Sequence, residues 1–115
     1  MTVRISGPAR RDIARVLTWS AERFGEAARD RYERLIFHGI GGLATADPPS
    51  SRAAPELEPS VRIYHLRNHR ARGPAAAVAR PRHLIVYRRE ADHNVEIIRL
   101  LHEASDLTSR FAAPG

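Results

Sequence analysis

Two stretches with helical periodicity, separated by one glycine, most constrain how this chain folds. Apolar side chains recur at helical spacing from Ile13 to Phe24, which places Phe24 on the apolar face of a first helix. Gly25 follows as a helix-ending residue that tolerates a positive φ, and a second periodic stretch runs from Ala28 to Leu43. A break this short between two amphipathic helices predicts an antiparallel helical hairpin.

The ends of the hairpin carry their own signals. Ser6, Gly7 and Pro8 form a helix-start pattern, because proline suits the first turn of a helix. Three glycines within residues 39–42 each weaken the end of the second helix by up to about 1 kcal/mol relative to alanine. They predict either fraying or close packing at that point.

Segments with strand character lie on both sides of the hairpin. VRI at residues 3–5 precedes it, and VRIYHL at 61–66, RHLIVYR at 82–88 and NVEIIRLL at 94–101 follow it. ADPPSSRAAPELEPS at 46–60 contains too much proline and serine for a helix or a central strand, so it is expected to be a connecting loop.

These elements predict an α+β fold of order β-α-α-β-β-β, with the helical hairpin packed on a mostly antiparallel twisted sheet. The 115 residues suit one domain, covering residues 1–115. An arginine-rich hairpin loop at about residues 67–81 is expected to join two of the strands, and a turn around residues 90–93 to join the last two.

The charge is concentrated in one segment. All 19 basic residues are arginine, and eight of them lie between Val61 and Arg89, where there is no Asp or Glu. The rest of the chain holds 11 Arg and 13 acidic residues, so this segment accounts for the net charge of +6. A GC-rich genome explains part of the arginine content, but the asymmetry indicates an acidic partner, either nucleic acid or a carboxylate-rich protein segment.

Several classes of protein are disfavoured. The chain has no cysteine, no apolar run near the ~20 residues that span a bilayer, and no apolar core of a signal peptide, so a cytoplasmic protein without membrane contact is expected. His65 and His69 are four residues apart on a strand and its exit, without a third ligand pattern, so no metal site is expected there. No cofactor is expected.

The last strand ends in a cluster of ionisable residues. Arg99 lies inside an apolar run, where an unpaired charge is costly, so an ion pair with Asp106 or Glu103 is expected. His102 is then expected to be a hydrogen-bonded histidine that caps the same corner, and Arg99, His102 and Asp106 together close the strand end. A functional role for these residues is the alternative interpretation.

The chain resembles the RelE/ParE toxins of bacterial type II toxin–antitoxin modules, and most closely the ParE branch. The resemblance is carried by PARRDIARVLTWSAERFGEAARDRYERLI, by VRIYHL, by RHLIVYR and by VEIIRLLHEASDL, in that order along nearly the whole chain. It implies a small toxin that is neutralised by an antitoxin encoded beside it. ParE-like members poison DNA gyrase and lack nuclease residues, whereas RelE-like members cleave messenger RNA on the ribosome.

Three functions follow from this resemblance. In the first, the toxin inhibits DNA gyrase without bond-making chemistry, and an acidic amphipathic segment of a ParD-like antitoxin binds across it, with nucleic acid contacted through the complex. The basic residues of this surface are expected to form one cationic rim. The residues expected to bind the antitoxin or target are Trp19, Arg62, Arg67, Arg70, Arg82 and Arg88.

In the second, the chain is a ribosome-dependent messenger-RNA endoribonuclease, which needs a base, an acid and cations around the attacked phosphate. The residues that would supply them are Arg62, His83, Tyr87, Arg99 and His102. The structural alternative for Tyr87 is a core position with its hydroxyl at the edge of the core. In the third, the chain is an inactive member that only binds an antitoxin.

Overall fold

The structure, a computed structural model, describes residues 2–69, 78–90 and 94–113. Arg70 and most of the turn at residues 90–93 lie outside them. In chain order the elements are β1 (Val3–Ile5), α1 (Gly7–Phe24), α2 (Glu26–Leu43), β2 (Arg52–Ala53), β3 (Val61–His65), the 3-10 helix η1 (Leu66–Asn68), β4 (His83–Arg89), β5 (Val95–His102) and α3 (Leu107–Ala112). The predicted α+β fold is confirmed, and β2, η1 and α3 are additions to it.

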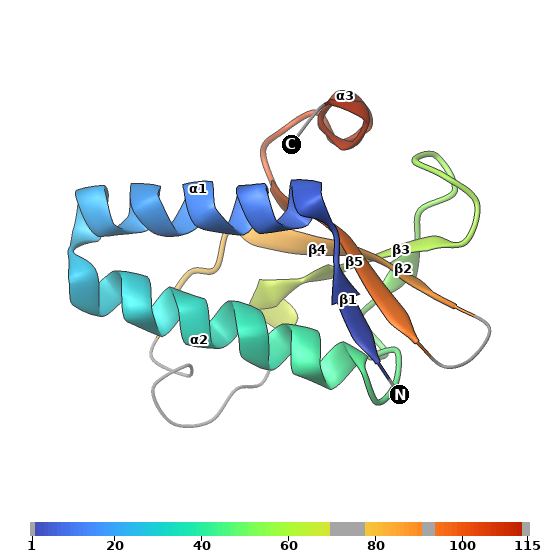
Figure 1. The fold of residues 1–115 in the computed structure, drawn as a ribbon, viewed down its shortest axis with the longest axis horizontal. Helices are drawn as coiled ribbons and strands as arrows, with labels where there is room; N and C mark the ends of the chain where they lie inside the picture. Colours follow the sequence, from blue (N-terminus) through green and yellow to red (C-terminus); the bar gives the residue numbers. More distant parts are fainter. Residues whose placement is uncertain (1, 70–77, 91–93, 114–115) are drawn as a thin grey trace.

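The strands form one mixed sheet in the order β1-β5-β4-β3-β2. β1 runs parallel to β5, and the other neighbouring pairs are antiparallel. The hairpin lies on one side of this twisted sheet, and α3 lies near its upper edge in the view of Figure 1. β2 is a two-residue edge strand inside the expected connecting loop, which agrees with the exclusion of a central strand.

The predicted boundaries of the hairpin are confirmed. The Ser6 hydroxyl accepts a hydrogen bond from the amide of Ala9 at 3.1 Å and donates one to the carbonyl of Ile98 at 2.7 Å. The N-terminus of α1 is thereby capped and tied to β5 at once. Gly25 has a φ of 93°, which favours glycine, and it separates α1 from α2.

The prediction for Phe24 was wrong, because its side chain is 63% exposed. The last turns of α1 extend beyond the strands (Figure 1), so the apolar face of the helix has no sheet beneath it there. Helical spacing alone does not reveal where the sheet ends. The tip of the hairpin is therefore exposed.

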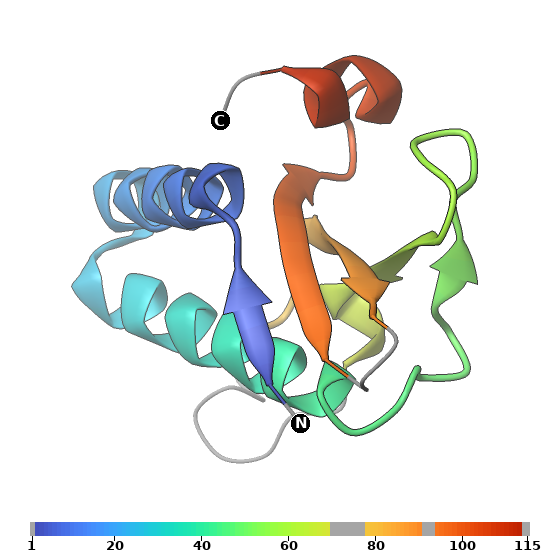
Figure 2. The same cartoon turned by 45° about the vertical axis from the view of Figure 1, so that its right-hand side comes forward.

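The sheet is covered on both faces. The larger core lies between the hairpin and one face, and it includes the fully buried Ile36, Ile85 and Tyr87. A smaller core on the other face includes Val61 and Val86, and both α3 and the segment before β3 pack against it. Figure 2 shows the hairpin and α3 on separate sides of the strands. Within the described residues, no helix is long and apolar enough to cross a membrane.

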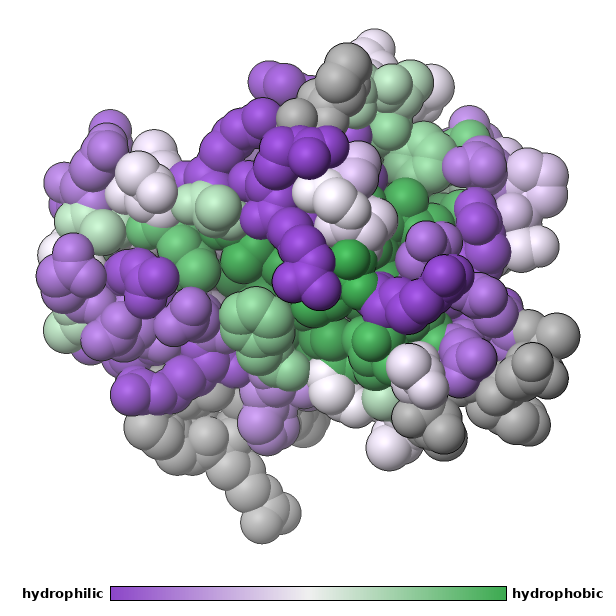
Figure 3. Space-filling view, viewed as in Figure 1, coloured by the Kyte–Doolittle hydropathy of each residue, from purple (hydrophilic) through white to green (hydrophobic). Residues whose placement is uncertain are grey.

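The face of the molecule seen in Figure 3 carries both hydrophilic and apolar side chains. Apolar side chains gather in a continuous band between the helices and over the neighbouring strands, and hydrophilic side chains surround that band.

The glycines near the end of α2 allow close packing. A Cβ added to Gly39 would lie 3.0 Å from Leu66 Cδ2, and one added to Gly42 would lie 3.4 Å from His69 Cε1. The helix therefore approaches η1 through positions without side chains. Of the two predicted alternatives, close packing is the one observed.

We expect Gly39→Ala to lower the free energy of unfolding by about 1–3 kcal/mol, because the new methyl group overpacks against Leu66. Gly41→Ala is the matched control. No atom lies within 4 Å of its added Cβ, so it is expected to be neutral or to stabilise by up to about 1 kcal/mol. Urea denaturation of both variants measures this, and equal effects would contradict the packing explanation.

Candidate functional site

A groove of about 740 Å³ lies between the exposed tip of the hairpin and the end of the sheet where β4 begins and β5 ends. We call it the hairpin groove. It is defined by the aromatic residues Trp19 and Phe24, the cationic residues Arg23, Arg31, Arg80 and Arg82, and the floor residues Tyr32, His83 and His102.

The aromatic wall of the hairpin groove is exposed. Trp19 is 45% exposed and packs edge-on against Phe24, with ring centroids 5.6 Å apart. The guanidinium carbon of Arg23 lies 5.8 Å from the centroid of the Trp19 ring. Exposed Trp beside Arg is the composition of binding hot spots in protein interfaces.

The cationic wall is only partly neutralised. Arg82 forms an ion pair with Glu103 at 3.0 Å. Neither Arg31 nor Arg80 has a carboxylate partner among the described residues, and the described lining contains no Asp or Glu. The groove therefore combines apolar surface with positive charge that the described chain leaves unmatched.

The floor is a neutral hydrogen-bonded pair. The Tyr32 hydroxyl accepts a hydrogen bond from the amide of Arg82 at 3.0 Å and lies 2.6 Å from His83 Nδ1, so it donates its own proton to that nitrogen. Burial raises the pKa of Tyr32 to about 12. Burial, helped by the neighbouring His102, lowers the pKa of His83 to about 4. Both groups are therefore uncharged at neutral pH.

The five residues considered for RNA cleavage fall into two groups, one at Asp47 and one at the end of β5. Tyr87 and Arg62 both contact Asp47, the first by a hydrogen bond of 2.9 Å and the second by an ion pair of 3.6 Å. His83 and His102 are ring neighbours, 5.1 Å apart, at the hairpin groove. Arg99 lines a cavity of about 180 Å³ together with His83 and His102, but its guanidinium is bound by the partners described next. Tyr87 is a core residue with a bonded hydroxyl, as its strand position predicted.

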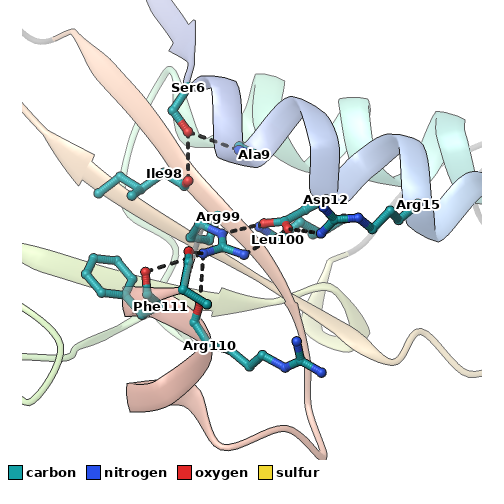
Figure 4. Close-up of polar contacts among 10 residues, drawn as sticks. Ser6, Ala9, Asp12, Arg15, Ile98, Arg99, Leu100, Arg110 and Phe111 are labelled. Atoms are coloured by element: carbon teal, nitrogen blue, oxygen red, sulfur yellow. Dashed lines mark hydrogen bonds and ion pairs between the residues drawn. The ribbon is translucent and has the colours of Figure 1, made fainter. Parts of the chain in front are cut away.

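The expected partner of Arg99 was wrong. Its guanidinium, almost fully buried, binds both carboxylate oxygens of Asp12 in α1, at 2.7 and 3.0 Å (Figure 4). Asp12 also accepts the amide of Leu100 at 3.0 Å, and Arg99 Nη1 donates to the carbonyls of Arg110 and Ala113 at 2.7 Å. One side chain thus joins α1, β5 and the end of α3. Local patterns could not point to Asp12 as the partner, because it lies 87 residues from Arg99.

The other residues of the expected corner have separate local roles. Asp106 accepts from the amide of Ser109 and caps the N-terminus of α3. His102 Nδ1 accepts from the amide of Ala104 at 3.0 Å, which matches the expected hydrogen-bonded histidine at the turn. Glu103 contacts His65 at 2.8 Å, and its ion pairs lower its pKa.

The expectation of a single cationic rim was also wrong. Arg62 is paired with Tyr87 across the sheet, so Arg88, the next residue, points to the opposite face. There Arg88 contacts Glu58 and Glu96, and Arg82 lies at the other end of β4. Arg67 is 3.8 Å from Glu103. Of the predicted binding residues that the structure describes, a set that leaves out Arg70, only Trp19 and Arg82 line the hairpin groove.

Comparison with protein families decides the relationship. The model of the ParE toxin of the type II toxin–antitoxin system, parDE, matches residues 3–107. The chain belongs to the ParE toxin family. Among curated proteins, none is similar enough to match it.

Membership of the ParE toxin family implies an antitoxin partner. Sequence reasoning missed Arg23, Arg31 and Arg80 as groove residues, because they approach one another only when the hairpin tip folds over the start of β4. The available signal in the sequence was Trp19, Arg23 and Phe24 close together before Gly25, a composition typical of binding surfaces.

We expect Asp12→Ala to lower the free energy of unfolding by about 3–5 kcal/mol, because it leaves the Arg99 charge buried without a partner. Asp106→Ala is the control, and its expected cost is about 0.5–2 kcal/mol for a lost helix cap. Chemical denaturation compares the two. A larger loss for Asp106→Ala would restore the partner predicted from sequence.

We expect the stability of the protein to fall as the pH drops from about 6.5 to 4. The pKa of folded His83, about 4, lies below the ordinary value of 6.5, so in this window only the unfolded chain takes up the proton. The loss from this residue is at most about 3 kcal/mol. His83→Gln, which keeps an acceptor for Tyr32, is expected to flatten the dependence in urea denaturation at several pH values, and an unchanged slope would refute this.

Proposed function

We propose that the chain is a ParE-like toxin that inhibits DNA gyrase by binding it, and that a ParD-like antitoxin neutralises it by placing an acidic amphipathic segment in the hairpin groove. The supporting observation is the composition of this groove. It presents two exposed aromatic side chains beside arginines, and its described lining contains no carboxylate.

The chemistry of the groove favours an amphipathic acidic peptide. An apolar side chain of such a segment would cover Trp19 and Phe24, which are 45% and 63% exposed in the free chain. Its carboxylates would face Arg31 and Arg80, which have no carboxylate partner among the described residues. Opposite charges at a groove also speed association at low salt.

Action by binding rather than cleavage is supported by the distribution of the catalytic candidates. Arg99 is fully engaged with Asp12 and the backbone of α3. Arg62 is turned toward Ser51 and Asp47. His83, with its pKa lowered to about 4, is a weak base at neutral pH.

We expect the purified chain to inhibit supercoiling by DNA gyrase, and the product of the adjacent antitoxin gene to relieve the inhibition when it is added in stoichiometric amounts. Gel assays of plasmid topology measure both effects. Translating extracts are the comparison. Cleavage of messenger RNA there, without any effect on gyrase, would replace this proposal by the endoribonuclease alternative.

Charge-reversal variants locate the antitoxin. Arg31→Glu and Arg80→Glu are expected to weaken antitoxin binding about tenfold or more in a titration, because like charges would face the acidic segment. Arg88→Glu is the matched control, since Arg88 lies on the opposite face of the sheet beside Glu58 and Glu96. Equal weakening by all three variants would indicate a nonspecific charge effect and remove the hairpin groove as the site.

A further inference from the structure

A histidine pair lies outside the hairpin groove, where the C-terminal half of α2 meets the end of η1. His38 Nδ1 is 2.7 Å from His69 Nε2. The other nitrogen of His69, Nδ1, lies 3.1 Å from the hydroxyl of Tyr64 in β3. In the sequence, His69 was considered together with His65 because the two are four residues apart. In the structure His65 contacts Glu103 instead.

The pair is built into the fold rather than formed by two mobile surface side chains. His69 is half-buried and approaches α2 at two glycines, where a Cβ on Gly42 would lie 3.4 Å from its ring and one on Gly39 would lie 3.9 Å from it. These distances are van der Waals contacts, so the imidazole lies directly against the helix backbone at the two glycines. The His69 ring is therefore positioned by the helix on one side and by Tyr64 at its Nδ1.

We propose that His38 and His69 form a two-imidazole binding site for a divalent transition-metal ion, of the class Cu²⁺, Ni²⁺ or Zn²⁺, with water completing the coordination. Imidazole nitrogen is a preferred ligand for these ions. Two metal–nitrogen bonds of about 2.0–2.1 Å that meet at 90–109° need nitrogens about 2.9–3.4 Å apart. The observed separation of 2.7 Å is close to this range. In the hydrogen bond the two nitrogens point at each other, so the exposed His38 ring has to swing aside until both lone pairs point at one ion.

The tautomers of the two rings allow a metal ion to replace the hydrogen bond between them. If His69 Nδ1–H donates to Tyr64, His69 Nε2 carries the lone pair, and the single proton between the rings belongs to His38 Nδ1. Transfer of that proton to His38 Nε2 frees the second ligand without a change in charge. Histidines that bind metal ions usually donate a hydrogen bond from the ring nitrogen that does not bind the metal.

Water can reach both histidines. A cavity of about 860 Å³ is lined by His69, Tyr64 and the two glycines, and also by Asp47 and Arg67. His38 does not line this cavity but is itself exposed. Among the described residues, no group of three or more His, Cys, Asp or Glu is placed to hold a metal ion. The ion would therefore have two protein ligands and open positions toward solvent, and it would clamp α2 to the end of η1.

The test is a titration of the full chain, without a polyhistidine tag, with CuCl₂, NiCl₂ and ZnCl₂ at pH 7.5 in a buffer that does not chelate metals. Calorimetry is expected to give one ion per chain, with Cu²⁺ bound most tightly. Electron paramagnetic resonance of the Cu²⁺ complex is expected to show two nitrogen ligands. Absence of saturable binding at millimolar metal overturns the proposal and leaves the pair as a hydrogen bond only.

Variants assign the ligands. His38→Gln and His69→Gln are each expected to abolish saturable binding, and His65→Gln, the control, to leave it unchanged. Tyr64→Phe keeps both ligands but removes the orienting hydroxyl, so it is expected to weaken binding about tenfold or more. Circular dichroism checks that each variant folds. If His69→Gln does not fold, His38→Gln still tests the proposal, because His38 is exposed and its substitution leaves the core intact. Wild-type affinity in both ligand variants overturns the proposal.

Discussion

The buried guanidinium of Arg99 is the interaction on which the rest of the structure depends. A charge inside a core is tolerated only when it is paired and its donors are satisfied. Asp12 supplies the charge, and carbonyls at the end of α3 take the remaining donors. Because these partners come from α1 and α3, the pair fixes how elements on both sides of the sheet sit against β5. The hairpin cannot shift along the strands without exposing an unpaired charge.

This fixed position of the hairpin also creates the groove. α1 starts at β5, where Ser6 is tied to Ile98, and its length carries its last turns past the strands. The residues at the tip then have no sheet to cover, so Trp19 and Phe24 remain exposed. The same offset leaves Arg31 and Arg80 beyond the reach of the described carboxylates, whereas Arg62 and Arg88 are neutralised at the sheet. The binding surface is thus a consequence of helix length relative to strand length.

Much of the architecture was accessible from sequence because its signals are local. Ser6, Pro8 and Gly25 set the ends of the helices through backbone chemistry that depends on neighbouring residues only. The strands after residue 60 were recognisable from their β-branched runs. The short α3 was missed, because six residues show too little periodicity and its stability comes from contacts with the sheet. The prediction of one cationic rim was wrong because successive residues of a strand point to opposite faces of a sheet. Arg62 and Arg88 therefore lie on different faces.

By itself, the sequence determined the order of the elements, the hairpin at Gly25 and the resemblance to the ParE branch. Local backbone preferences and side-chain periodicity do not need a partner from elsewhere in the chain. Only the tertiary structure decided that Arg99 meets Asp12, that His38 meets His69, and which arginines keep an unmatched charge. The physical reason is that ion pairs and hydrogen bonds act over a few ångströms in space, and folding sets those distances between residues far apart in sequence.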